Sequence, residues 1–102
     1  MNDDQDKLVD LVDKIFLGGQ LSDLEEKIFR LAHDRLTYAE VAEKLGYNID
    51  HIKRVGAKFW KKLSVKLNEK VCKTNFQRAL IRYAKAQDLL LHIIHKTEDS
   101  QE

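Results

Sequence analysis

The sequence predicts a single all-α domain, on three observations. Strand signals are weak, because the chain has no proline, only four glycines and no alternating Val/Thr/Tyr run. Apolar residues instead recur at the three- and four-residue spacing of amphipathic helices. Two Ser/Thr-x-x-Glu patterns also mark helix starts. A length of 102 residues suits one core made of several helices, so we expect residues 1–102 to form one domain.

The sequence argues against a disulfide-rich, a secreted and a membrane-spanning protein. A single cysteine, Cys72, excludes an intrachain disulfide framework. The acidic opening "MNDDQDKL" is unlike a secretory signal, and the longest apolar runs, 89–91 and 93–94, are too short to span a membrane. These features predict a cytoplasmic protein with no membrane partner.

Charge is distributed unevenly, although the net charge is only +1. Residues 1–49 carry a net −5, residues 50–85 a net +9 and residues 86–102 a net −3. A basic middle third of this kind is either an electrostatic footprint for nucleic acid or a solvated lysine-rich helix face.

The N-terminal segment predicts a short amphipathic helix over residues 6–17, with residues 1–5 frayed. Gly18-Gly19 ends the pattern. The apolar stripe consists of Leu8, Leu11, Val12 and Ile15. This stripe needs a cover, either the core of the same chain or a second subunit.

Residues 22–63 predict three helices joined by tight turns. Ser22 with Glu25 forms one capping-box pattern, and Thr37 with Glu40 repeats it fifteen residues later. Asn48 is a good N-cap for the third helix. The apolar stripe of that helix contains Ile52, Val55, Phe59 and Leu63.

The spacing of four residues in this core indicates a helix-turn-helix rather than a generic helical hairpin. Ala42 is small where the two helices cross, and Gly46 suits a left-handed turn. Ile52 and Val55 then face back toward the first helix. Val41, Leu45 and Phe59 are expected to complete a small hydrophobic triangle with the preceding helix.

A long last helix is expected over residues 75–96, with Thr74 or Asn75 as its cap. Trp60 is expected to pack beneath it against Phe76 and Leu80. The stretch "LLLHIIH" is apolar on more than one face, so the N-terminal helix or a second chain must cover it.

The outward face of the third helix, over residues 49–63, is the candidate DNA-binding surface, because this face enters the major groove in a helix-turn-helix. Arg54 can donate two hydrogen bonds to guanine, and Lys53 can donate to guanine or phosphate. Further along the helix, Lys58, Lys61 and Lys62 suit phosphate contacts better. Thr37 and Tyr38 begin the preceding helix, where a phosphate is commonly within reach. Asp50 either accepts from a cytosine or only favours the helix N-terminus. The full set of candidates is Thr37, Tyr38, Asn48, Asp50, His51, Lys53, Arg54, Ala57, Lys58, Lys61 and Lys62.

The pieces "TYAEVAEKLGY", "VGAKFWKKLS" and "EKVCKTNF" carry a family resemblance. Residues 20–82 resemble the N-terminal helix-turn-helix domain of cyanobacterial vWA-MoxR-associated proteins and of some NB-ARC-type proteins. More distantly, they resemble the LuxR-type and sigma-factor region 4 classes. The resemblance implies a cyanobacterial or similar bacterial source and a domain usually attached to an effector or ATPase. Because only twenty residues follow the match, we expect no such module in this chain.

Two departures from this family make the exposed face more basic. Ile49-Asp50-His51 replaces an acidic-Gly-aromatic run, and Lys61-Lys62 follows the tryptophan where uncharged residues are usual. Both changes favour nucleic acid over a neutral docking surface.

Catalytic and metal-binding patterns are weak. His92 and His95 lie one helical turn apart without a cysteine or carboxylate to complete a metal site, so packing histidines are expected. No Gly-rich phosphate loop, GxSxG or HExxH motif is present. We expect no enzyme, no cofactor, no metal and no small-molecule substrate.

The sequence therefore predicts a small transcription regulator that binds double-stranded DNA as a homodimer. Its alternative is a protein-interaction adaptor for a signalling ATPase or effector. The terminal helices are the expected dimer interface, and which of the two is used stays open. That interface would contain Leu8, Leu11, Val12, Ile15, Leu89, Leu90, Leu91, Ile93 and Ile94.

Overall fold

Five helices make up the described chain, and the all-α prediction is confirmed. The computed structural model describes the backbone of residues 3–16 and 21–100 and the side chains of residues 5–16 and 21–88. The helices are α1 (Asp3–Ile15), α2 (Asp23–His33), α3 (Tyr38–Leu45), α4 (Ile49–Leu67) and α5 (Phe76–Ser100). Within the described ranges, no helix is long and apolar enough to cross a bilayer.

The predicted start and stop signals of the central helices are confirmed. Ser22 begins α2 with a capping box, in which its Oγ accepts the Glu25 N–H at 3.1 Å and its own N–H donates to Glu25 Oε1 at 3.0 Å. Thr37 and Glu40 do the same for α3. Gly46 then ends α3 in the left-handed conformation, with φ 74°.

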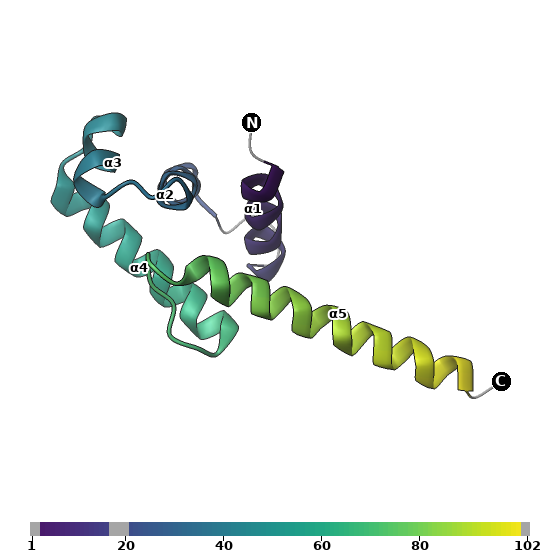
Figure 1. Cartoon of the computed structure of the whole chain (residues 1–102). Coiled ribbons are helices and arrows are strands. Elements are labelled where there is room, and N and C mark those ends of the chain that lie inside the picture. The colour runs from purple at the N-terminus through teal and green to yellow at the C-terminus, as the bar shows by residue number, and fades with distance from the viewer. Residues whose placement is uncertain (1–2, 17–20, 101–102) are drawn as a thin grey trace.

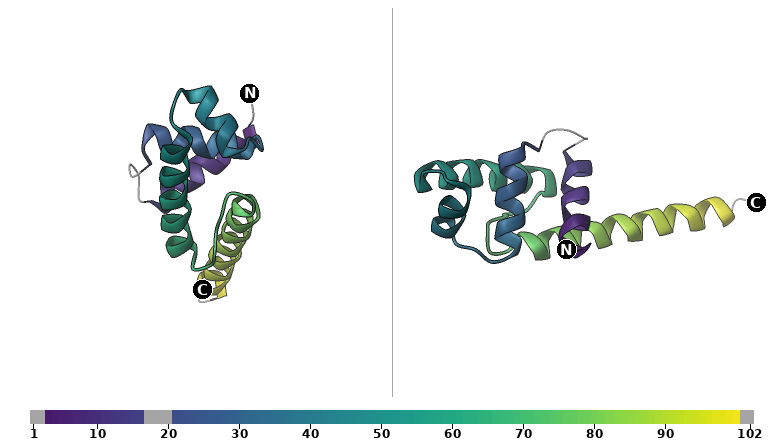
Figure 2. Two further views of the ribbon diagram at one scale, coloured as in Figure 1. Left: turned by 90° about the vertical axis from the view of Figure 1, so that its left-hand side faces the viewer. Right: turned by 90° about the horizontal axis from the view of Figure 1, so that it is seen from above.

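The central helices form the helix-turn-helix, and α5 extends from it. Figure 1 shows α4 running beneath α3 and α2, with α5 leading away from the rest of the molecule to the C-terminus. The principal extents of 60 × 29 × 23 Å reflect this projection. The two further views show α1 beside α2 and crossing over the first half of α5 (Figure 2).

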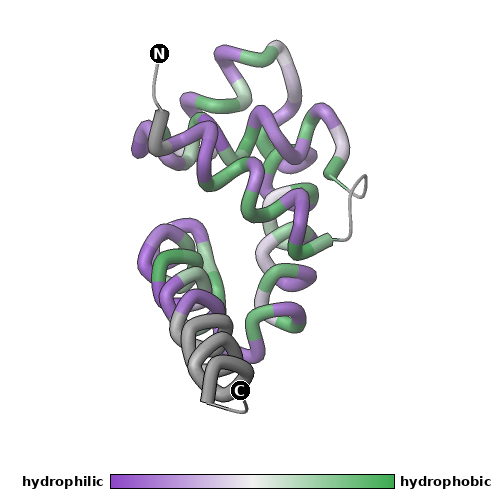
Figure 3. Tube along the Cα trace, turned by 90° about the vertical axis from the view of Figure 1, so that its right-hand side faces the viewer, coloured by the Kyte–Doolittle hydropathy of each residue, from purple (hydrophilic) through white to green (hydrophobic). Residues whose placement is uncertain are grey.

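The core consists of two adjoining clusters, because α2 and α4 bury apolar side chains in both. The smaller cluster holds α3 against α2 and α4 through Ile28, Val41, Ala42 and Ile52. The larger cluster joins α1, α2, α4 and α5 around Phe29, Phe59, Trp60 and Phe76. Hydrophobic and hydrophilic segments alternate along the helices, as amphipathic packing requires (Figure 3).

The expected triangle of Val41, Leu45 and Phe59 is wrong. Phe59 lies in the larger cluster, with edge-on contacts to Phe16 and Phe29 at centroid distances of 6.0 and 5.9 Å. Its ring faces α2 and Phe16, the residue that follows α1, rather than Val41 and Leu45 of α3. The expected packing of Trp60 on the last helix is confirmed, since its ring stacks on Phe76 at 4.9 Å.

Helix α1 begins earlier than predicted, and part of its stripe belongs to the core. It spans Asp3–Ile15 rather than 6–17, and Leu17 with Gly18-Gly19 lies outside the described residues. Gln5, expected to be frayed, is buried and donates to the Arg30 carbonyl at 3.0 Å. Val12 is fully buried within one chain, so it is a core residue rather than an interface residue.

Helix α5 spans Phe76–Ser100, so it begins one residue later and ends four residues later than predicted. Neither of the two expected cap residues, Thr74 and Asn75, caps the start of α5 with its side chain. Asn75 Oδ1 accepts the Cys72 N–H at 2.7 Å, and the Thr74 hydroxyl lies 3.2 Å from Cys72 Sγ. Asn75 therefore holds the segment that precedes the helix. The side chains of residues 89–94, part of the expected dimer interface, lie outside the described residues.

Candidate nucleic-acid interface

Helix α4 divides into a buried face and an exposed basic face, as its spacing predicts. Ile52, Phe59 and Leu63 are fully buried. The opposite side of the helix is exposed at Asp50, His51, Lys53, Arg54, Ala57, Lys58 and Lys61. We call these seven residues the α4 outer face.

The beginning of α4 is fixed by the turn that precedes it. The Tyr47 N–H donates to the Ala42 carbonyl at 3.0 Å, and Asn48 Oδ1 accepts the Asp50 N–H at 2.8 Å. Asn48 thus caps the helix as predicted. The Tyr47 ring stacks on His51 with a centroid distance of 5.5 Å, which supports the histidine at the start of the outer face.

The cations of the α4 outer face are not neutralised by neighbouring acids. Among the described side chains, Lys53, Arg54, Lys58 and Lys61 form no ion pair. Asp50 lies in the first turn of α4, where a carboxylate favours the positive end of the helix dipole. The face therefore presents four cations over about two and a half helical turns, a pattern suited to phosphate and base-edge contacts.

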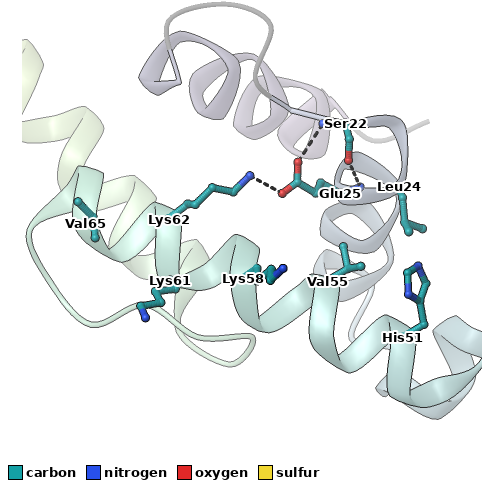
Figure 4. A pocket seen from close by; sticks show the side chains of 9 residues that line it. All are labelled: Ser22, Leu24, Glu25, His51, Val55, Lys58, Lys61, Lys62 and Val65. Atoms are coloured by element: carbon teal, nitrogen blue, oxygen red, sulfur yellow. Dashed lines mark hydrogen bonds and ion pairs between the residues drawn. The ribbon is translucent and has the colours of Figure 1, made fainter.

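Lys62, the remaining lysine of the predicted set on α4, forms an ion pair with α2. Its Nζ lies 2.7 Å from Oε2 of Glu25, whose side chain is only 9% exposed. The ion pair closes one side of a groove of about 670 Å³ between the start of α2 and α4 (Figure 4). The groove is lined by Ser22, Leu24, Glu25, His51, Val55, Lys58, Lys61, Lys62 and Val65.

This ion pair makes stability depend on pH. Burial alone would raise the pKa of Glu25, but Lys62 and the Ser22 N–H together hold that pKa below its ordinary value. A lowered pKa means that the contribution is present at neutral pH and is lost as pH falls through it. Glu25→Gln, which can keep the capping box, is expected to destabilise the fold by about 1–2 kcal/mol at pH 7.

Urea unfolding at pH 7 and pH 3 measures this effect. The gap in unfolding free energy between wild type and Glu25→Gln should narrow as the pH falls through the lowered pKa of Glu25, because the wild-type carboxylate then also becomes protonated. Glu40→Gln is the matched control, because Glu40 occupies the same capping-box position without an ion pair among the described residues. Glu40→Gln should lower the free energy of unfolding much less than Glu25→Gln does. An equal loss in both variants at both pH values would contradict the role of Lys62.

Thr37 and Tyr38, predicted to approach a phosphate, both have partners within the fold. Thr37 Oγ1 accepts the Glu40 N–H at 3.1 Å, and Tyr38 Oη accepts the Trp60 Nε1–H at 2.9 Å. Each hydroxyl keeps its own proton to donate. The Tyr38 ring also packs against Gly56, and Lys73 Nζ lies 5.6 Å from the ring centroid.

Lys73 was not singled out from the sequence, and neither was Lys70 three residues earlier. Both belong to the connection between α4 and α5, where no helical period assigns a direction to a side chain. The only sequence signal was the general excess of lysine and arginine over residues 50–85. No group of three His, Cys, Asp or Glu side chains in the described part of the chain could hold a metal ion.

Comparison with known proteins identifies one family. The model of the vWA-MoxR associated protein N-terminal HTH family matches residues 4–83, which include the complete helix-turn-helix and the start of α5. No curated protein and no solved structure matches the chain. A family match over most of the chain, together with the observed α2–α3–α4 geometry, shows that the chain belongs to the vWA-MoxR associated protein N-terminal helix-turn-helix family.

Proposed function

We propose that this chain binds double-stranded DNA sequence-specifically as a small bacterial transcription regulator, with α4 in the major groove. The observation that carries the proposal is the α4 outer face, whose four cations are exposed and have no acid partner among the described residues. In this binding mode Lys53 and Arg54 contact base edges, and Lys58 and Lys61 contact phosphates. Asn48 and His51 lie at the N-terminal end of α4, which would enter the major groove first.

The proposal includes a homodimer, because one short recognition helix contacts few base pairs. Leu8, Leu11 and Ile15 remain only partly buried on α1. Between α1 and α5 lies a groove of about 420 Å³ that includes Leu8, Leu11 and Ile81, the last of them 47% exposed. A second copy would cover this apolar surface, and light scattering of the pure protein measures whether it does.

Fluorescence anisotropy with mixed-sequence duplex DNA over a salt series tests the proposal. Each phosphate contact adds about −0.9 to the slope of log affinity against log salt. Of the three residues replaced in Lys53→Ala/Arg54→Ala/Lys58→Ala, only Lys58 is assigned to a phosphate. This variant should therefore flatten the slope by about 0.9 and also weaken the affinity through the two lost base-edge contacts. The matched control is Lys7→Ala/Lys14→Ala/Lys27→Ala, which removes three exposed lysines from α1 and α2 and should leave most of the slope.

Two results would overturn the DNA-binding proposal. One is the absence of binding by the wild-type chain at low salt. The other is an equal effect of the two triple variants, because net charge alone would then explain the binding. Site selection from a random duplex library would follow a positive result and determine whether the binding is sequence-specific.

The groove of Figure 4 favours one alternative, a protein-interaction adaptor. Its apolar walls include Leu24, Val55 and Val65, and Val65 is 74% exposed. An adaptor that uses this groove should lose its protein partner on Val65→Asp and keep it on Arg54→Ala. A DNA-binding protein should instead lose DNA affinity on Arg54→Ala and keep it on Val65→Asp. This pair of variants therefore distinguishes the two functions.

A further inference from the structure

The connection between α4 and α5, residues 68–75, is held in place by hydrogen bonds and a buried side chain rather than being a loose linker. Val71 is buried, and its N–H donates to Ser64 Oγ at 2.8 Å. Asn75 Nδ2 donates to the Lys70 carbonyl at 2.9 Å, while its Oδ1 accepts the Cys72 N–H. These contacts hold the backbone of residues 70–75 in one conformation, so the lysines on it start from fixed positions. We call residues 68–75 the α4–α5 connection.

The α4–α5 connection borders the α4 outer face. A hollow of about 500 Å³ has Ala57 and Lys61 of that face on one wall and Lys70 and Lys73 on the other. Tyr38, at the start of α3, lines the same hollow. The proposed phosphate contacts at the start of α3 and along α4 are therefore continuous with the connection, although Lys70 lies nine residues after Lys61 in sequence.

The basic surface continues beyond Lys73. A second hollow of about 540 Å³ is bounded by Arg35, Lys73 and Arg78, so Lys73 lies between the two hollows. None of the basic residues that line these hollows forms an ion pair with a described residue. Glu40 also faces this region, but its carboxylate accepts the Thr37 N–H at 2.8 Å in the capping box.

A protein that enters the major groove lies between two phosphate backbones about 12 Å apart. Contacts to these backbones set the orientation of the recognition helix without selecting a sequence. A cation beside the start of α3 is placed to extend such contacts along the strand that passes Thr37 and Tyr38. Lys73, within 6 Å of the Tyr38 ring, has this position.

We propose that the α4–α5 connection is a second phosphate-binding element of this domain, in which Lys70 and Lys73 bind the DNA backbone beside the groove entered by α4. Its ligand is the phosphodiester backbone, and Arg35 and Arg78 extend the same strip. This inference rests on the proposed function, because it assigns further contacts to the same DNA.

The first test is the salt dependence of DNA affinity for Lys70→Ala/Lys73→Ala. Loss of two phosphate contacts should flatten the log–log slope by about 1.8 and weaken binding to different duplex sequences by the same factor. Lys27→Glu is the control, because it lowers the net charge by the same two units at an exposed position of α2, away from the groove between α1 and α5. If the wild type binds DNA and the two variants have equal slopes, this inference fails while the proposed function stands.

The second test uses the wild-type chain and its single cysteine. Cys72 is partly exposed and lines the hollow shared by Lys61, Lys70 and Lys73. Interaction with the Thr74 hydroxyl lowers the pKa of its thiol, which favours reaction with iodoacetamide near pH 8. Saturating duplex DNA should slow this alkylation several-fold, because the backbone would cover the hollow.

An unchanged alkylation rate at a DNA concentration that saturates binding would overturn the inference. High salt that dissociates the complex should restore the free rate. If the wild-type chain binds no DNA even at low salt, the proposed function fails and this inference fails with it.

Discussion

Phe59→Ala is expected to destabilise the domain by about 3–5 kcal/mol. The Phe59 ring is fully buried and meets Phe16, Phe29 and Trp60 at centroid distances of 6.0, 5.9 and 4.9 Å. Truncation removes contacts with α1 and α2 together and leaves a cavity between them. Because small domains are stabilised by only about 5–15 kcal/mol, a large part of the variant should be unfolded well below the wild-type midpoint.

Urea unfolding followed by circular dichroism measures this loss. Val65→Ala is the control on the same helix, since Val65 is 74% exposed and its truncation should change stability by less than about 0.5 kcal/mol. A Phe59→Ala variant as stable as Val65→Ala would show that the aromatic cluster does not hold α1, α2 and α4 together. The comparison is direct because both substitutions place alanine in α4.

Gly56→Leu is expected to cost about 2–3 kcal/mol, through overpacking between α3 and α4. A Cβ at position 56 would lie 3.0 Å from both Cε1 and Oη of Tyr38, and leucine adds further atoms in that direction. Tyr38 would have to move outward. The Trp60 indole N–H, which donates to Tyr38 Oη at 2.9 Å, would then lose its partner while the ring stays buried.

A double-mutant cycle with Tyr38→Ala measures the origin of this cost. In the Tyr38→Ala background the added leucine has room, so Gly56→Leu should lose at least half of its effect. Additivity within about 0.5 kcal/mol would contradict the proposed clash. Gly56→Ala is an informative companion, because it gains about 1 kcal/mol of helix propensity and adds only the first of the clashing atoms.

Tyr38 and Lys62 have partners within the fold that the sequence did not predict. Both were expected near phosphates, Tyr38 because it begins the helix that precedes α4 and Lys62 because it lies further along α4. In the fold, Tyr38 bonds to Trp60 and Lys62 pairs with Glu25 across α2 and α4. Neither partner is visible in a local sequence pattern, because each lies on another helix.

Segments without a helical period were the least predictable. Gln5 looked like part of a frayed end, yet it bonds to Arg30, twenty-five residues away. Lys73 looked like one lysine among many, yet it lies over Tyr38, thirty-five residues earlier. Long-range partners of this kind decide burial and direction at the ends of helices and in connections, where local spacing carries no information.

The sequence by itself determined the helix-turn-helix, because its signals are local. Capping boxes at Ser22 and Thr37, the left-handed turn at Gly46 and the stripe of α4 each depend on residues within about two helical turns. The family assignment depends on the same local signals.

The tertiary structure alone decided how the outer helices and the α4–α5 connection surround this unit. It buried Val12 inside one chain, turned Lys62 toward Glu25 and brought Lys70 and Lys73 to the side of α4. The physical reason is that these placements depend on packing between segments far apart in sequence. The free energy of such packing comes from the joint burial of side chains on several helices, and no single stretch of sequence contains it.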